Sequence, residues 1–177
     1  HYYDLRSMHA GSPEPIWEGD YIYYPVSNSD KYELYRINPE TSNIEPVLRG
    51  QYSLEEYHVS NDVIAYTRVN TDKPAELWVK DPQERQLTTH NQEIVLDVRL
   101  QTAEKFSFTQ KDNATVEGWL LKPDNWREGE NYPAVLDIHG GPKSKFGDSL
   151  MFEHQLFASN GYAVLYINIR GSGGYSQ

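Results

Sequence analysis

Residues 132–142 read Tyr-Pro-Ala-Val-Leu-Asp-Ile-His-Gly-Gly-Pro, a nearly continuous apolar run that ends in a pair of glycines. A run that is apolar on both faces predicts a parallel strand covered by helices on both sides. α/β folds bind their ligands beyond the carboxyl ends of such strands, where glycines let the backbone approach a bound group. We therefore expect a functional site after Ile138, with a glycine turn that binds nothing as the alternative.

Four further segments surround this strand and complete one βαβ unit with a preceding hairpin. They are two alternating strands, a helix and a second apolar strand, at residues 104–109, 115–121, 148–160 and 162–169. The helix is expected to begin at Asp148 or Ser149, whose side chains can cap it, and to stop at Asn160 and Gly161. The second apolar strand is expected to leave an open hydrogen-bonding edge.

The first half of the chain repeats one plan. Residues 20–24 and 62–66 share a pattern 42 positions apart, and residues 32–36 and 75–80 share another 43 positions apart. A polar hairpin joins the two strands of each unit, and a third strand follows. A period of about 40–45 residues with about four strands per unit is typical of a β-propeller blade. We expect two blades, with residues 1–10 as the tail of an earlier one; a two-repeat meander or sandwich is the alternative.

The composition excludes several classes of function. The 177 residues carry 16 basic and 26 acidic side chains, a net charge of −10, which disfavours nucleic acid and anionic membranes as partners. The absence of cysteine excludes thiolate metal sites and cysteine nucleophiles. The six histidines show no metal-binding spacing. We therefore expect no metal and no cofactor, and self-association into a homo-oligomer stays open.

The start of the chain predicts a missing segment. His1 replaces the usual methionine, and no apolar signal-peptide core follows it. Two blades are also fewer than the roughly four to eight of a propeller, so we expect a piece of a polypeptide about three times longer. A cytoplasmic location is expected, with secretion left open. The sequon at residues 113–115 matters only in a secreted protein.

Three parts of the sequence resemble the prolyl oligopeptidase family of serine peptidases, and its acylaminoacyl peptidase branch in particular. They match in order and spacing, and they lie at residues 117–123, 132–142 and 157–175. The resemblance implies β-propeller blades followed by the N-terminal part of an α/β-hydrolase domain. Residues 1–98 would be the last two or so blades and residues 99–177 the start of the hydrolase domain, and both domains would be incomplete.

The resemblance also implies an activity and its residues. The family hydrolyses short or N-acylated peptides through an acyl-serine intermediate, with a Ser-Asp-His triad. The backbone N–H of Gly141 would stabilise the oxyanion, and His139 lies where some relatives carry an oxyanion tyrosine. Arg170 is expected to hold its own loop by ion pairing more than to bind substrate. The residues that would line the substrate site are Gly140, Pro142, Lys143, Lys145, Phe146 and Arg170.

The sequence departs from the family at the nucleophile. No serine fits the Gly-x-Ser-x-Gly elbow; Ser172 has Gly174 after it but Arg170 before it. The triad is therefore expected outside these residues, in the remainder of the same polypeptide, and the 177 residues alone are expected to be inactive. Two alternatives stay open: a carboxylesterase on the same scaffold and a non-catalytic propeller interaction protein. The acidic pair Glu55-Glu56 is interpreted as surface charge.

Overall fold

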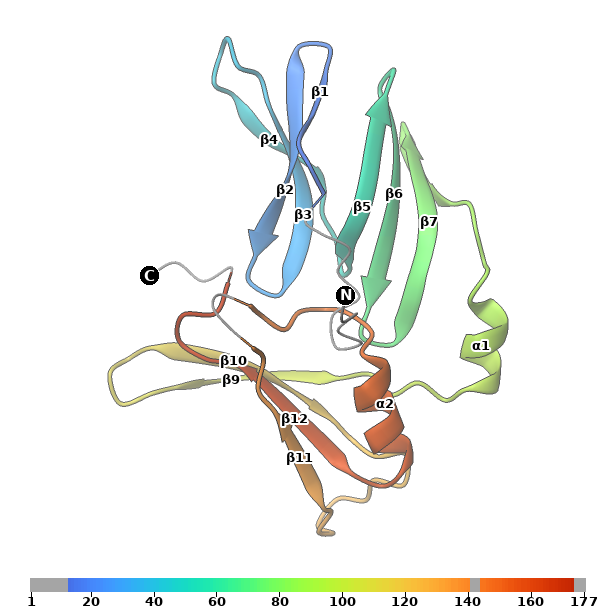
Figure 1. Ribbon diagram of the computed structural model, residues 1–177, viewed down its shortest axis with the longest axis vertical. Helices are drawn as coiled ribbons and strands as arrows, with labels where there is room; N and C mark the ends of the chain where they lie inside the picture. Colours follow the sequence, from blue (N-terminus) through green and yellow to red (C-terminus); the bar gives the residue numbers. More distant parts are fainter. Residues whose placement is uncertain (1–12, 141–143, 174–177) are drawn as a thin grey trace.

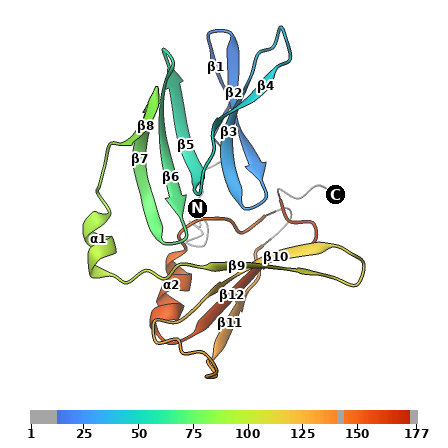
Figure 2. The same cartoon turned by 180° about the vertical axis from the view of Figure 1, so that it is seen from behind.

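The computed structural model describes residues 13–140 and 144–173. These residues form three four-stranded sheets. Two sheets stand side by side, and the third lies across their lower ends (Figures 1 and 2). No helix in the described ranges is long and apolar enough to cross a membrane.

The first two sheets are antiparallel meanders with their strands in chain order. The first contains β1 (Ile16–Glu18), β2 (Tyr21–Asn28), β3 (Lys31–Ile37) and β4 (Ile44–Leu48). The second contains β5 (Ser53–Ser60), β6 (Val63–Asn70), β7 (Lys73–Asp81) and β8 (Gln83–Gln86). Asn61 and Asp62 both have positive φ, as the two-residue turn between β5 and β6 requires. The sequence pattern predicts three strands per blade and does not reveal the first strand of each, β1 and β5.

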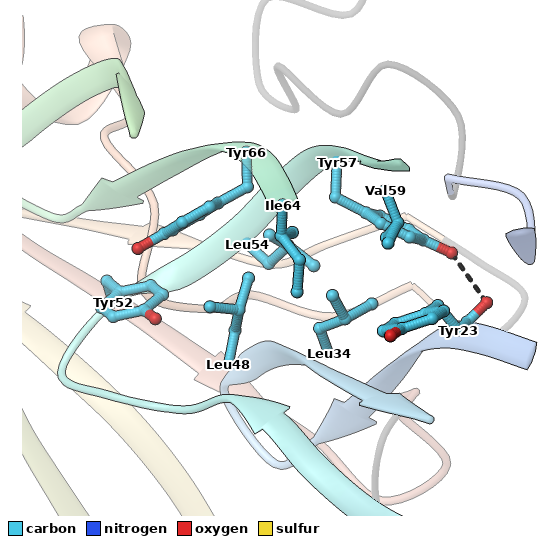
Figure 3. Close-up of a cluster of buried hydrophobic side chains, with 9 residues drawn as sticks. All are labelled: Tyr23, Leu34, Leu48, Tyr52, Leu54, Tyr57, Val59, Ile64 and Tyr66. Atoms are coloured by element: carbon cyan, nitrogen blue, oxygen red, sulfur yellow. Dashed lines mark hydrogen bonds between the residues drawn. The ribbon is translucent and has the colours of Figure 1, made fainter. Parts of the chain in front are cut away.

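A buried apolar cluster joins the two blades (Figure 3). Its members are Tyr23, Leu34, Leu48, Tyr52, Leu54, Tyr57, Val59, Ile64 and Tyr66. Leu34 and Leu48 are fully buried, and burying one such side chain contributes about 1.5–3 kcal/mol. The hydroxyl of Tyr57 donates to the carbonyl oxygen of Tyr23 at 3.0 Å, so one hydrogen bond also crosses the cluster.

The third sheet has the order β11-β12-β10-β9. Its strands are β9 (Glu104–Thr109), β10 (Thr115–Leu121), β11 (Ala134–Asp137) and β12 (Ala163–Asn168), and the helices are α1 (Gln92–Asp97) and α2 (Phe152–Ser159). β11 and β12 are parallel and α2 connects them, which confirms the βαβ unit. The expectation of an open edge on the second apolar strand is wrong. β12 lies inside the sheet because its other side pairs antiparallel with β10.

Helix α2 is shorter than predicted. It begins at Phe152 after Met151, which makes no side-chain capping bond. Asp148 does not cap it, because its backbone N–H donates to the carbonyl oxygen of Asp30 at 2.8 Å and its carboxylate faces Lys31 at 3.5 Å. The predicted end is correct, since Gly161 has a φ of +87°.

Strand β11 is not covered on both sides within the described residues. The side chain of Leu136 is 54% exposed, and that of Ile138, just after the strand, is 56% exposed. The inner strand β12 is the better buried of the two, with Val164 and Tyr166 in the core of the third sheet. Burial on both faces, which the sequence predicted for β11, therefore describes β12 better than β11.

Candidate functional site

Two loops meet at the carboxyl ends of β11 and β12. The first starts with Ile138, His139 and Gly140, and the second comprises residues 169–173. β11 and β12 pair directly and run parallel, so their carboxyl ends lie at the same edge of the sheet. This is the edge at which α/β proteins place their ligands.

His139 connects the two loops. Its Nε2 lies 2.6 Å from the Ser172 hydroxyl oxygen, and the same hydroxyl lies 2.6 Å from the carbonyl oxygen of Ile169. The ring nitrogen and the carbonyl therefore share the Ser172 hydroxyl as a hydrogen-bond partner. Nδ1 of the ring lies 2.9 Å from the carbonyl oxygen of Gly140. The imidazole therefore bridges the loop after β11 and the turn after β12.

Phe146 lies behind this bridge. Its backbone N–H donates to Asn168 Oδ1 at 2.7 Å, and its carbonyl accepts from Asn168 Nδ2 at 2.9 Å. Its ring is buried and packs edge-on against His139 and Tyr166 at centroid distances of 5.4 and 5.2 Å. The structure thus places Phe146 in the core that supports the loops and not on the surface of the site.

The side chain of Arg170 contacts the hairpin between β9 and β10. Its guanidinium forms an ion pair with Asp112 in the turn between β9 and β10, and it lies 3.5 Å from Gln110 Oε1. The hydrogen bond from Arg170 lowers the pKa of the Asp112 carboxyl below its usual value. This contact holds the turn after β12 against the β9–β10 hairpin.

The remaining predicted residues are only partly placed. Gly141, Pro142 and Lys143 lie outside the described residues. Gly140 is exposed, and a side chain there would meet nothing within 4 Å. Lys145 reaches away from the sheet, and its ammonium donates to Ser27 Oγ in the first blade at 2.7 Å.

One polar pair at the end of β11 was not predicted from the sequence. His154 on α2 is 3% exposed, and its Nε2 lies 2.8 Å from Asp137 Oδ2 at the end of β11. The imidazole also packs against Tyr166 at 4.5 Å. The only signal in the sequence was an aspartate inside an apolar strand, which needs a partner when buried. Among the described residues no group of three histidine or acidic side chains is placed to hold a metal.

The acidic pair Glu55-Glu56 was interpreted as surface charge, and the structure places only one of the two side chains fully at the surface. Both residues lie at an irregularity in the register between β5 and β6. Glu56 is exposed, but Glu55 is only partly so. Burial and the neighbouring charge of Glu56 raise the pKa of Glu55. Surface charge therefore describes Glu56 alone.

Comparison with known proteins gives one family match and several relatives. A family model described as acetyl xylan esterase (AXE1) matches residues 64–177. The uncharacterized peptidase YuxL of Bacillus subtilis is 32% identical over 169 residues, which cover 92% of this chain and 26% of that protein. The chain thus spans about a quarter of the length of this relative.

Solved structures of peptidases also match most of this chain. The acylaminoacyl peptidase of Pyrococcus horikoshii is 30% identical with a TM-score of 0.83, covering 92% of this chain and 26% of that one. An acylaminoacyl peptidase in complex with Z-Gly-Gly-Phe-chloromethyl ketone is 29% identical with a TM-score of 0.84, covering 97% and 27%. The expected fold class, propeller blades followed by the first part of an α/β-hydrolase, is confirmed, and the described blades do not close into a ring.

Proposed function

This chain belongs to the acetyl xylan esterase (AXE1) family, and we propose that it is part of a serine peptidase that cleaves short or N-acylated peptides through an acyl-serine intermediate. The observation that carries the proposal is the pair of loops at the carboxyl ends of β11 and β12, held together by His139 and Ser172. A loop in this position supplies backbone N–H groups to the oxyanion of an acyl-transfer intermediate.

We assign the roles from the resemblance of the glycine loop to the oxyanion loop of α/β-hydrolases. Gly141 gives its backbone N–H to the oxyanion, and the second donor is the N–H of the residue after the nucleophile. His139 fixes the loop through Ser172 and takes no part in proton transfer. The nucleophile, its base and the base's carboxylate come from the remainder of the same polypeptide, because no Gly-x-Ser-x-Gly occurs in this sequence.

A peptide substrate is supported by a neighbour of known structure. The acylaminoacyl peptidase that resembles this chain at a TM-score of 0.84 is in complex with a peptide chloromethyl ketone, Z-Gly-Gly-Phe-chloromethyl ketone. In our proposal residues 1–98 are blades that restrict access to the site, and residues 99–177 begin the catalytic domain. Restricted access would favour short peptides over folded proteins.

A carboxylesterase is the second candidate, and one observation favours it. The family model that covers residues 64–177 is described as acetyl xylan esterase. Esters and amides pass through the same tetrahedral intermediate, so the oxyanion loop serves both reactions. The difference must lie in the residues that position the leaving group.

Steady-state kinetics of the full-length protein separate these two functions. The substrates are the p-nitroanilide of an N-acetyl amino acid and p-nitrophenyl acetate. A peptidase should turn over the anilide with a kcat/KM in the usual enzymatic range of about 10⁴ M⁻¹s⁻¹ or more. Ester turnover with anilide turnover near background would reject the peptidase and support the esterase. Turnover of neither substrate would contradict both.

A further inference from the structure

Residues 144–151, the segment that leads into α2, run between the third sheet and the blades (Figure 1). Lys145 of this segment extends its ammonium into the hairpin between β2 and β3. The ammonium donates to Ser27 Oγ at 2.7 Å, to the carbonyl oxygen of Ser29 at 2.8 Å and to that of Lys31 at 3.4 Å. Three acceptors match the three N–H groups of a lysine.

Charged side chains from both parts surround this contact. Lys105 of β9 bridges Asp30 of the hairpin and Glu117 of β10, at 2.8 Å to each carboxylate. The hydroxyl of Ser29 donates to Glu117 at 2.5 Å. With Lys31 and Asp148 at 3.5 Å, the group contains three ammonium groups, Lys31, Lys105 and Lys145, and three carboxylates, Asp30, Glu117 and Asp148. The formal charges therefore balance across the boundary.

The backbone of the segment is held on the same side. The N–H of Asp148 donates to the carbonyl oxygen of Asp30 at 2.8 Å. Gly147 lies so close to that carbonyl that a side chain at this position would collide with it. Residues 145–148 therefore follow the surface of the blade hairpin closely.

The other side of the segment is held by the site. Phe146 exchanges two hydrogen bonds with Asn168 at the end of β12 and packs against His139. The carbonyl oxygen of Ser144 accepts from the N–H of Gly173 at 3.0 Å. The segment thus touches the blade on one side and both loops of the site on the other.

The ammonium of Lys145 is partly buried and donates to neutral oxygen atoms. Burial lowers the pKa of its ammonium to about 8, and Asp30 and Glu117 oppose this shift. Charged lysines are rarely buried unless they are paired.

We propose that Lys145 is a positioning residue. Its ammonium ties the segment that follows the oxyanion loop to the β2–β3 hairpin of the blade, and this contact aligns the loop. The inference rests on the proposed function, because it concerns the same loop. Docking of the blade would then set the geometry of the catalytic loop. Small displacements of oxyanion donors cost large factors in rate, since these groups act through preorganisation.

The test is a kinetic comparison in the full-length protein. Lys145→Met removes the ammonium and keeps most of the side-chain volume. Lys122→Met is the matched control, because Lys122 pairs with Glu104 inside the third sheet at 2.6 Å. Rates are divided by the fraction of sites that a fluorophosphonate labels. We expect kcat per labelled site to fall about 10- to 100-fold in Lys145→Met, KM to change less than about threefold, and Lys122→Met to match the wild type.

A double substitution tests the proposed route. Ser27→Ala removes one acceptor of the Lys145 ammonium, and its effect on kcat should not add to that of Lys145→Met. A normal kcat per labelled site in Lys145→Met would overturn the proposal, even with a lower melting temperature, because the lysine would then only hold the sheets together. Full additivity with Ser27→Ala would also contradict it.

Hydrogen exchange provides a readout that does not depend on turnover. Lys145→Met should raise the exchange rates of the backbone amides at residues 28–31 and 144–148 together, relative to Lys122→Met. Exchange that is unchanged in both segments would reject the coupling. If the wild type neither hydrolyses substrate nor labels, the proposed function fails, and hydrogen exchange still decides whether Lys145 couples the blade to the loop.

Discussion

The hydroxyl of Ser172 lies 2.6 Å from His139 Nε2 and 2.6 Å from the carbonyl oxygen of Ile169. A serine beside a histidine in a glycine-rich turn has the appearance of a nucleophile with its base. The geometry differs in that Ser172 is only 4% exposed and its hydroxyl also bonds to a backbone carbonyl. Its burial therefore leaves no open path to a substrate.

Substituting Ser172 tests this structural role. Ser172→Ala leaves His139 Nε2 and the Ile169 carbonyl without their shared partner, which should cost about 1–3 kcal/mol of unfolding free energy. Chemical denaturation of the full-length protein measures the loss. Labelling by a fluorophosphonate should persist at wild-type stoichiometry once the variant is folded. Complete loss of labelling in a folded variant would identify Ser172 as the nucleophile.

The pKa of Lys145 predicts how stability depends on pH. Its value is about 8 in the folded protein, against 10.5 for an ordinary lysine. Between these values the unfolded chain binds a proton that the folded chain does not, so this group makes unfolding less favourable as pH rises. The cost of burying the ammonium is thus fully present below pH 8 and disappears toward pH 10.5.

Lys145→Met isolates this effect, because all other titrations are shared with the wild type. The difference in melting temperature, wild type minus Lys145→Met, should become more positive when the pH is raised from 7 to 9.5. Scanning calorimetry of both full-length proteins at the two pH values measures it. An equal difference at both values would show that Lys145 does not titrate in this range.

At the scale of elements, one tyrosine links β5 of the second blade to β2 of the first. The hydroxyl of Tyr57 on β5 donates to the carbonyl oxygen of Tyr23 on β2 at 3.0 Å and lies 2.8 Å from that of Glu14 (Figure 3). Burial raises the pKa of this hydroxyl to about 12. The hydrogen bond is set inside the apolar cluster, so its loss leaves the Tyr23 carbonyl without this partner.

Tyr57→Phe removes only the hydroxyl and should lower the unfolding free energy by about 1–2 kcal/mol. Tyr24→Phe is the control, because Tyr24 lies on the same strand as Tyr23 but outside the apolar cluster. Urea denaturation of the full-length variants compares the two. Equal effects of the two substitutions would show that the blade-to-blade hydrogen bond contributes nothing specific.

The close approach of Gly147 to the β2–β3 hairpin gives a second prediction at this scale. Gly147→Ala places a methyl group against the carbonyl of Asp30 and should push the segment off the blade. We expect faster hydrogen exchange at Asp148, whose N–H donates to that carbonyl, and a stability loss of about 1–3 kcal/mol. Unchanged exchange at Asp148 would mean that the hairpin moves with the segment.

Local patterns predicted the type of most elements and missed several boundaries. The repeat identified the inner strands of both blades, because their apolar alternation is strong. β1 was missed because it has only three residues, and β5 because an irregularity interrupts its alternation. Helix α2 starts later than predicted because Asp148 bonds to the blade, a tertiary contact that overrides a local capping signal.

At the scale of the whole molecule, the architecture followed from the order of the motifs, while the contacts between its parts did not. The parallel pairing of β11 and β12 follows from the βαβ pattern. The pairing of β12 with β10 joins residues about 50 positions apart with no helix to signal it. Lys145 contacts Ser27 across 118 positions. No periodicity in the sequence carries such distances, so the contacts across the boundary between the blade and the hydrolase sheet required the structure.

For the candidate site, the sequence predicted the loop but not the side-chain contacts that hold it. The glycine loop predicted a site at the carboxyl ends of the parallel strands, and the structure brings His139 and the turn after β12 together at that edge of the sheet. The bridge between His139 and Ser172 and the buried pair of His154 and Asp137 were not expected. Each depends on side-chain directions that spacing alone does not encode.

The most direct test of the account is to map the serine that a fluorophosphonate modifies in the full-length protein. We propose that these 177 residues supply the oxyanion loop and the blade that positions it, while the nucleophile lies elsewhere in the same polypeptide. Peptide mass mapping should find one modified serine, inside a Gly-x-Ser-x-Gly sequence outside residues 1–177. Modification of a serine within these residues, or no modification of an active and folded protein, would contradict the account.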